Sequence, residues 1–362
     1  MTTSGATVDA AVAAVDAAIA HRDLPRLQTA YGALASAPKE ALADRSAEIG
    51  PRLARQLPEM PPWHAAVYAV LVGALVEWDA DAGACAPPLL EGLRKSLEQG
   101  IEFARLWRET HGEDEEPPDP TGLPSPAQQK AFGDDYADVW HAPYFGWLTV
   151  AKWESAAVAV LADPAVRRSL RDRDALVALT ERLEPEIGDL QCVQKALLLL
   201  DEEPLLVLDR ASGQGFRLRM SGIADNYQLQ TLLAAVLIGG GHLPGDAPGA
   251  EAVALSTDAP FDSGRQQPPH RLESFNFAEP SGRWIWSATT PSRLPVVDGV
   301  RQLVLDAPVF RHDYATVRFL PRVSARLALE AVLTPAEAAP YFSGVRELMS
   351  WQEASRLAAD GY

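Results

Sequence analysis

The stretch ALLLLDEEPLLVLDRASGQGFRLRM, residues 196–220, decides the fold class because the hydrophobic pattern changes within it. Before it, Ala and Leu recur at helical spacing. After it, short runs alternate apolar and polar residues, which is typical of strands. Charge changes at the same place: residues 1–203 hold 18 Lys+Arg against 33 Asp+Glu, whereas residues 204–362 hold 14 against 16 and contain no lysine. We therefore predict two domains of different class, all-α over 1–203 and α+β over 204–362.

The first domain is predicted from Ala- and Leu-rich segments separated by proline and short polar breaks. The expected helices span 5–21, 24–36, 39–57, 64–78, 88–110, 127–141, 144–162, 164–171, 173–184 and 187–201. Paired helices with short connections favour a helical bundle or a solenoid-like domain, although no fixed repeat period is present. Residues 111–128 are acidic and proline-rich, and they predict a solvated loop.

The second domain opens with two apolar runs, 205–208 and 216–220, which predict a hairpin around a glycine-containing turn. An apolar helix is expected over 225–238. Further strands are expected near 251–256, 272–278, 283–288, 301–306, 315–320 and 326–332, with a turn at Pro280-Ser281-Gly282. Thr334-Pro335-Ala336-Glu337 has the pattern of a capping box and should begin a last helix. Because helices do not alternate with the strands, we predict a mainly antiparallel sheet and not a dinucleotide-binding fold.

The composition limits the partners and the compartment. A formal net charge of −17 argues against nucleic acid and against anionic membrane surfaces, because both attract basic proteins. The two cysteines, Cys85 and Cys192, fit a reducing cytoplasm, where both should be buried apolar residues. The N-terminal segment lacks the basic residues of a signal peptide, and the apolar run 63–78 is too short to span a bilayer. These features predict a cytoplasmic protein. Arginine outnumbers lysine 27 to 5, as codon bias in a high-GC bacterial genome would produce, so we also expect a bacterial source.

The densest polar stretch of the second domain is SGIADNYQ, residues 221–228. Asp225 and Gln228 have the spacing of a capping box, which by itself accounts for both. Asn226 is not explained by capping. The helix N-terminus could also bind an anionic or amide-bearing ligand, with Arg217 and Arg219 approaching across the sheet. Capping alone and capping plus ligand binding both remain open from the sequence.

One helix carries residues that could ligate a metal. Asp134, Asp138 and His141 lie at i, i+4 and i+7, and Asp138-x-x-His141 has the spacing of a carboxylate–histidine pair. Two-metal sites in helical bundles use two such pairs and two further carboxylates, and only one pair occurs here. The alternative is the solvated side of an amphipathic helix, and we expect no metal. We also expect no cofactor, because the glycine-rich segments 212–215 and 239–241 lack the P-loop and dinucleotide spacings.

Aromatic residues gather in both halves. In the first, Trp140, Tyr144, Phe145, Trp147 and Trp153 surround Pro143, which is expected to break the helix. The cluster could be a packed helix corner or an apolar ligand pocket.

In the second half, Trp284 and Trp286 are two residues apart and should share one sheet face. They could belong to the core, to an interdomain contact or to a binding surface. His312 precedes Asp313, but neighbours in a strand point to opposite faces, so the two do not predict a catalytic pair. Trp284, Trp286 and His312 are therefore further candidates for ligand binding.

No Gly-x-Ser-x-Gly elbow or other catalytic motif is present. The leading hypothesis is a binding or adaptor protein that recognises a protein, a peptide or a small molecule. The alternative is a metal-independent enzyme of specialised metabolism with a pocket at the domain boundary.

Overall fold

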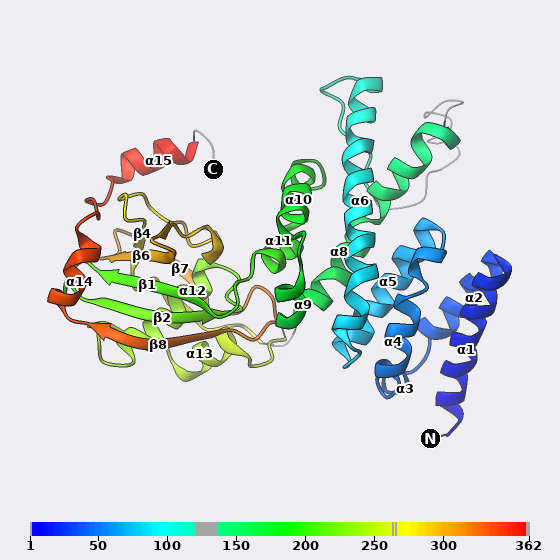
Figure 1. The fold of residues 1–362 in the computed structure, drawn as a ribbon, viewed down its shortest axis with the longest axis horizontal. Coiled ribbons are helices and arrows are strands. Elements are labelled where there is room, and N and C mark those ends of the chain that lie inside the picture. Colours follow the sequence, from blue (N-terminus) through cyan, green and yellow to red (C-terminus); the bar gives the residue numbers. More distant parts are fainter. Residues whose placement is uncertain (1, 121–135, 263, 265, 311, 360–362) are drawn as a thin grey trace. The chain divides into compact units, whose positions relative to one another are not determined.

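The computed structural model describes residues 2–120, 136–262, 264, 266–310 and 312–359 (Figure 1). The chain forms two compact units, Met1–Leu197 and Leu198–Tyr362, which we call unit 1 and unit 2. In the described part, helices fill the N-terminal half and all strands lie after residue 202, as the change in hydrophobic pattern predicts. None of the described helices is both long and apolar enough to cross a membrane.

The described residues of unit 1 form helices and no strands. Its helices are α1 (Thr2–His21), α2 (Leu24–Ala35), α3 (Lys39–Ala43), α4 (Ser46–Ala54), α5 (Pro62–Glu77), α6 (Ala82–His111), α8 (His141–Leu161), α9 (Pro164–Ser169), α10 (Arg173–Ile187) and α11 (Gln191–Leu198). A 3-10 turn, η1 (Leu57–Glu59), and a π-helical turn, η2 (Tyr136–Trp140), complete them. Residues 112–120 form neither helix nor strand, which agrees with the predicted loop, and 121–128 lie outside the described residues.

The core of unit 1 forms where α8 packs against α5 and α6. Glycine permits the close approach, since a Cβ on Gly146 would lie only 2.2 Å from the Cβ of Gln99. The rings of Trp140, Tyr144 and Trp147 are buried against Phe103, with centroids 5.2–6.0 Å apart. These three aromatic residues of the 140–153 cluster therefore pack in the core.

Four expectations for unit 1 need correction. The segment 39–57 forms two helices, because the chain turns at residues 44–45. Helix α6 begins at Ala82 and not at 88, because the Asp81 side chain accepts a hydrogen bond from the Ala84 N–H and caps it. Pro143 does not break α8, since it lies in the first turn, where proline is tolerated. Cys85 is buried as expected, but Cys192 is exposed.

Unit 2 is built on a sheet whose strand order is β4-β6-β1-β2-β8, with β5 added beside β6. The strands are β1 (Glu203–Asp209), β2 (Gly215–Ser221), β4 (Asn276–Ala278), β5 (Val296–Val297), β6 (Val300–Asp306) and β8 (Arg326–Leu333). Every pairing in it is antiparallel except β1 with β6, which is parallel. A separate antiparallel pair joins β3 (His270–Leu272) to β7 (Asp313–Ala315). The mainly antiparallel sheet is confirmed, and Figure 1 shows β1, β2 and β8 side by side.

The helices of unit 2 are α12 (Asn226–Leu233), which continues into the π-helical turn η3 (Ala234–Ile238), α13 (Ala250–Thr257), α14 (Pro335–Phe342) and α15 (Trp351–Ala359). A 3-10 turn, η4, spans Pro291–Arg293. Helix α12 and η3 together match the predicted helix 225–238. The capping box at Thr334 and Glu337 is also present.

The two faces of the sheet contact different elements because side chains alternate along a strand. Phe216, Leu218 and Met220 of β2 point into the main core, where they pack with apolar residues of α12 and η3. On the opposite face, Leu206 and Leu208 of β1 belong to a smaller cluster that includes residues of α14.

Several predicted strands differ in the structure. Residues 251–256 form helix α13, because Ala252 and Leu255 are buried at a spacing of three. The segment 272–278 bends between β3 and β4, and 315–320 contributes only the end of β7. The segment 283–288 forms only an isolated bridge between Trp284 and Ala278, although the turn at Pro280-Ser281-Gly282 is present. These pieces are too short to show the alternation by which strands are recognised.

Candidate functional site

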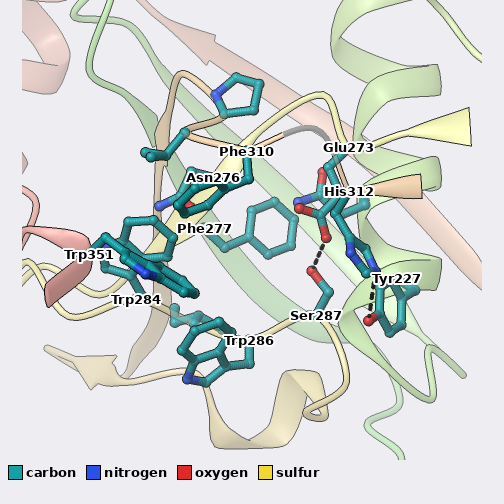
Figure 2. Close-up of a pocket in the computed structure, with 14 residues that line it drawn as sticks. Tyr227, Glu273, Asn276, Phe277, Trp284, Trp286, Ser287, Phe310, His312 and Trp351 are labelled. Carbon is teal, nitrogen blue, oxygen red and sulfur yellow. Dashed lines mark hydrogen bonds between the residues drawn. The ribbon is translucent and has the colours of Figure 1, made fainter. Parts of the chain in front are cut away.

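The candidate site is a pocket of about 360 Å³ inside unit 2, between α12, β4 and the loops that precede β7 and follow β4 (Figure 2). It brings together residues that are far apart in the sequence. The lining residues are Tyr227, Gln230, Glu273, Asn276, Phe277, Trp284, Ile285, Trp286, Ser287, Pro308, Val309, Phe310, His312 and Trp351. Trp284, Trp286 and His312, candidates from the sequence, are thus neighbours in one cavity.

One wall of the pocket is aromatic, as Figure 2 shows. The rings of Trp284 and Trp286 lie 6.1 Å apart, and Trp351 of α15 contacts both, at 5.3 and 5.7 Å between centroids. Phe310 packs edge-on against Trp351 at 4.6 Å. The Trp284 indole N–H donates to the carbonyl of Met349 at 2.8 Å, which anchors the C-terminal segment to this wall.

The facing wall is polar. Tyr227 and His312 are joined by a hydrogen bond of 3.2 Å between the phenol oxygen and Nε2. The Ser287 hydroxyl donates to the Glu273 carboxylate at 2.6 Å. Burial, together with the nearby carboxylates of Glu273 and Asp225, raises the pKa of Tyr227, so its hydroxyl stays protonated at neutral pH.

Two amide side chains of the pocket have buried polar atoms without a hydrogen-bond partner among the described residues. Gln230 is 1 % exposed, and its Oε1 is unpartnered. The Nδ2 of Asn276 is likewise buried and unpartnered. Leaving such atoms unpaired is energetically costly, and native interiors therefore contain few of them. Both atoms are buried, so neither is exposed to the open space of the pocket.

The polar stretch before α12 holds the pocket together. Asp225 caps the helix, accepting from the Gln228 N–H at 2.9 Å, while the Gln228 side chain accepts from the Ala224 N–H and donates to the carbonyl of Ser256. The expected reciprocal capping box is therefore not formed, because the Gln228 side chain accepts from the Ala224 N–H and not from the Asp225 N–H. Asn226 is fully buried, and its Nδ2 donates to the carbonyl of Trp286 and to Thr289 Oγ1. Asn226, which capping does not explain, therefore has a structural role, because it holds the loop that carries Trp286.

The anion-binding geometry that was one of the two alternatives for the start of α12 is not assembled. The N–H groups of Asn226, Tyr227 and Gln228 already donate to Thr289 O, Ser287 O and Asp225 Oδ1. Arg217 and Arg219 lie on the face of β2 opposite the core residues that pack with α12. Arg217 donates to the Tyr341 hydroxyl, and Arg219 pairs with Glu330 at 2.5 Å.

The weak metal candidates are not brought together with further ligands. Asp134 lies outside the described residues, and Asp138 and His141 are exposed. Among the described residues, no group of three or more His, Cys, Asp or Glu side chains is arranged to hold a metal ion.

Replacing Asp225 by alanine should lower the free energy of unfolding by about 1 kcal/mol, because the Gln228 N–H loses its acceptor at the start of α12. Urea unfolding followed by circular dichroism measures the loss. Thr334→Ala, which removes the corresponding cap of α14, is the matched control and should cost a similar amount. An Asp225→Ala variant as stable as the wild type would show that the cap contributes nothing.

Several residues of both walls were missed from the sequence. Glu273, Asn276, Ser287 and Trp351 belong to short strands, loops and a terminal helix that carry no motif. Gln230 carried no distinguishing signal, because α12 also buries the polar residues Asn226, Gln228 and Thr231. Comparison of the chain with protein-family models, with curated proteins and with solved structures gives no match.

Proposed function

We propose that the protein is a small-molecule-binding protein and that the pocket of unit 2 is its ligand site. The observation that carries the proposal is a pocket in which an aromatic wall faces a polar wall that holds the Tyr227–His312 and Ser287–Glu273 hydrogen bonds. Ligand sites are typically concave and largely apolar, with a few convergent polar groups. The volume of about 360 Å³ suits a small organic molecule better than a folded partner.

A specific contact supports the second candidate, a metal-independent enzyme. The hydrogen bond between Tyr227 and His312 joins a phenol to an imidazole, a pairing that can transfer a proton. We favour binding, because the lining of the pocket is largely aromatic and apolar.

The proposal can be tested with Prodan, a neutral naphthalene dye whose emission changes in an apolar site. We expect the full chain to bind it saturably at one site per chain. Trp286→Ala should weaken binding about tenfold or more, because truncating a central aromatic contact removes a large part of the apolar area. Trp286 is only half-buried, so the variant should remain folded, and a melting curve verifies this.

Trp63→Ala is the matched control, since Trp63 is a half-buried tryptophan of unit 1. It should leave dye affinity within about twofold of the wild type. If Trp286→Ala unfolds, Phe310→Ala replaces it, because Phe310 is 49 % exposed and lines the same wall. Absence of saturable binding, or equal affinity in the wild type and the pocket variants, would refute the proposed site.

A further inference from the structure

We propose that strand β8 of unit 2 pairs with β8 of a second copy of this chain, so that two sheets join edge to edge in an antiparallel, symmetric dimer. The proposed interface is a surface other than the pocket and does not depend on the proposed function. It follows from the free edge of β8 and from the order of the charges along this strand.

Strand β8 forms one margin of the sheet, because the strand order ends with β2 and β8 (Figure 1). Among the described residues, the backbone of 326–333 pairs with β2 alone. A strand that pairs on one side uses only half of its N–H and C=O groups there, so the other half faces away from β2. Such a row of unpaired groups is a template for a further strand.

The sequence of β8 does little to protect this edge. RLALEAVL contains no proline and no lysine, which are common at protected edges, and six of its eight residues are apolar. A shift in the pairing with β2 makes Glu330 a bulge residue, but 326–329 pair regularly. Every residue of β8 is exposed or half-buried, so a partner strand would cover apolar surface that now contacts water.

The order of the charges along β8 fits a second copy of the same strand. If two antiparallel copies are centred on Ala328, Arg326 of each lies opposite Glu330 of the other. All three residues are on the face of the sheet that carries Arg219, since Ala328 is opposite Arg219 and Glu330 pairs with it at 2.5 Å. Arg326 is exposed, and no ion pair joins it to a described residue. Opposite charges at facing positions stabilise paired strands.

The other face of β8 fits the same register. Leu327 of each copy would lie opposite Leu329 of the other, and both leucines are only partly buried against the main core. Two cross-strand leucine pairs would therefore lose further contact with water. Net charge opposes this association little, because residues 204–362 hold 14 Lys+Arg against 16 Asp+Glu.

Sedimentation of the full chain over a dilution series should show a monomer–dimer equilibrium. Arg326→Glu and Glu330→Arg should each weaken the dimer about tenfold or more, because each places like charges opposite one another twice. The double variant Arg326→Glu/Glu330→Arg restores opposite charges and should recover most of the affinity. Arg356→Glu, which reverses an exposed charge on α15, is the control and should leave the equilibrium unchanged.

Cysteine crosslinking tests the register. In a Cys192→Ser background, which removes the exposed native thiol, Ala328→Cys should give a disulfide-linked dimer on oxidation with copper phenanthroline. The two copies of residue 328 face each other across the symmetry axis, within the range of a disulfide. Ala331→Cys is the matched control: three residues from the axis, its two copies would lie about 20 Å apart along the strands and should not be linked.

Three results would overturn the proposal. The first is a wild-type chain that stays monomeric throughout the dilution series, which would leave the edge to a strand of another protein. The second is a dimer whose affinity is the same in the wild type and in both charge variants, since its interface would lie elsewhere. The third is crosslinking through Ala331→Cys and not through Ala328→Cys. If a charge variant fails to fold by circular dichroism, the crosslinking pair still decides. Dye binding in the pocket tests the proposed function separately.

Discussion

Raising the pH from about 4.5 to about 7 should reduce the stability of unit 1 by about 3 kcal/mol through one side chain, Glu154. Glu154 lies on α8 and is 8 % exposed. Burial raises its pKa to about 7, and the carboxylates of Asp189 and Glu184 add to the effect, whereas the Val193 N–H, which donates to Oε1 at 3.2 Å, opposes it.

Stability falls as the pH rises because the folded state holds the Glu154 proton more tightly than the unfolded state does. The unfolded chain loses the Glu154 proton near pH 4.5, while the folded chain keeps it until about pH 7. Between these values the folded state binds more protons, so the free energy of unfolding falls by about 1.4 kcal/mol per pH unit and is constant above the folded pKa. Urea unfolding at several pH values, with hydrogen exchange of the α8 amides to localise the change, measures it.

Glu154→Gln should remove this dependence, because glutamine keeps the acceptor for the Val193 N–H without ionising. Glu91→Gln is a control in which the pH dependence of stability should change in the opposite direction. Arg94 lowers the pKa of Glu91, so the stabilising effect of that carboxylate is present above its unfolded pKa and is lost on acidification. Parallel stability curves for the wild type and Glu154→Gln would contradict the assignment.

Gly222→Ala should destabilise unit 2 by about 3 kcal/mol or more. Gly222 follows β2 with φ +66°, a conformation that costs an L-residue free energy. A Cβ there would also lie 2.2 Å from the carbonyl oxygen of Ser324, a backbone atom that cannot rotate away. The Gly222 N–H donates to the Leu200 carbonyl at 2.9 Å, so a shift would break a second contact.

Gly299→Ala separates the cost of backbone strain from the cost of a steric clash. Gly299 has φ +79°, but nothing lies within 4 Å of an added Cβ, so the loss should be about 1 kcal/mol from conformational strain alone. Thermal and urea unfolding of both variants provide the comparison. Equal losses at the two positions would show that the contact with Ser324 relaxes and that only backbone strain matters.

The sequence predicted the elements whose signals are local and long. The hairpin of β1 and β2, the helix formed by α12 and η3, and the cap at Thr334 each occupy a continuous segment with its own periodicity or capping residues. The change near residue 203 likewise located the transition from helices to strands, because each class has its own hydrophobic period. That residues 204–362 fold independently of residues 1–203 remains a prediction.

The candidate site was predicted only in part. The tryptophan pair and His312 were singled out as separate features, with no means of knowing that they share a cavity with Tyr227 and Trp351. The arginines of β2 were expected near α12, but alternation places them on the other face of the sheet. Predicting that outcome requires knowing which face α12 covers.

By itself, the sequence determined where helices give way to strands and how several of them begin and end, since these depend on residues a few positions apart. The tertiary structure alone decided the pocket, because its walls come from α12, β4, the loops around residues 284–287 and 308–312, and α15. It also left Gln230 Oε1 and Asn276 Nδ2 without partners among the described residues. Whether a buried polar atom is satisfied depends on every segment folded around it, and that is a property of the assembled fold.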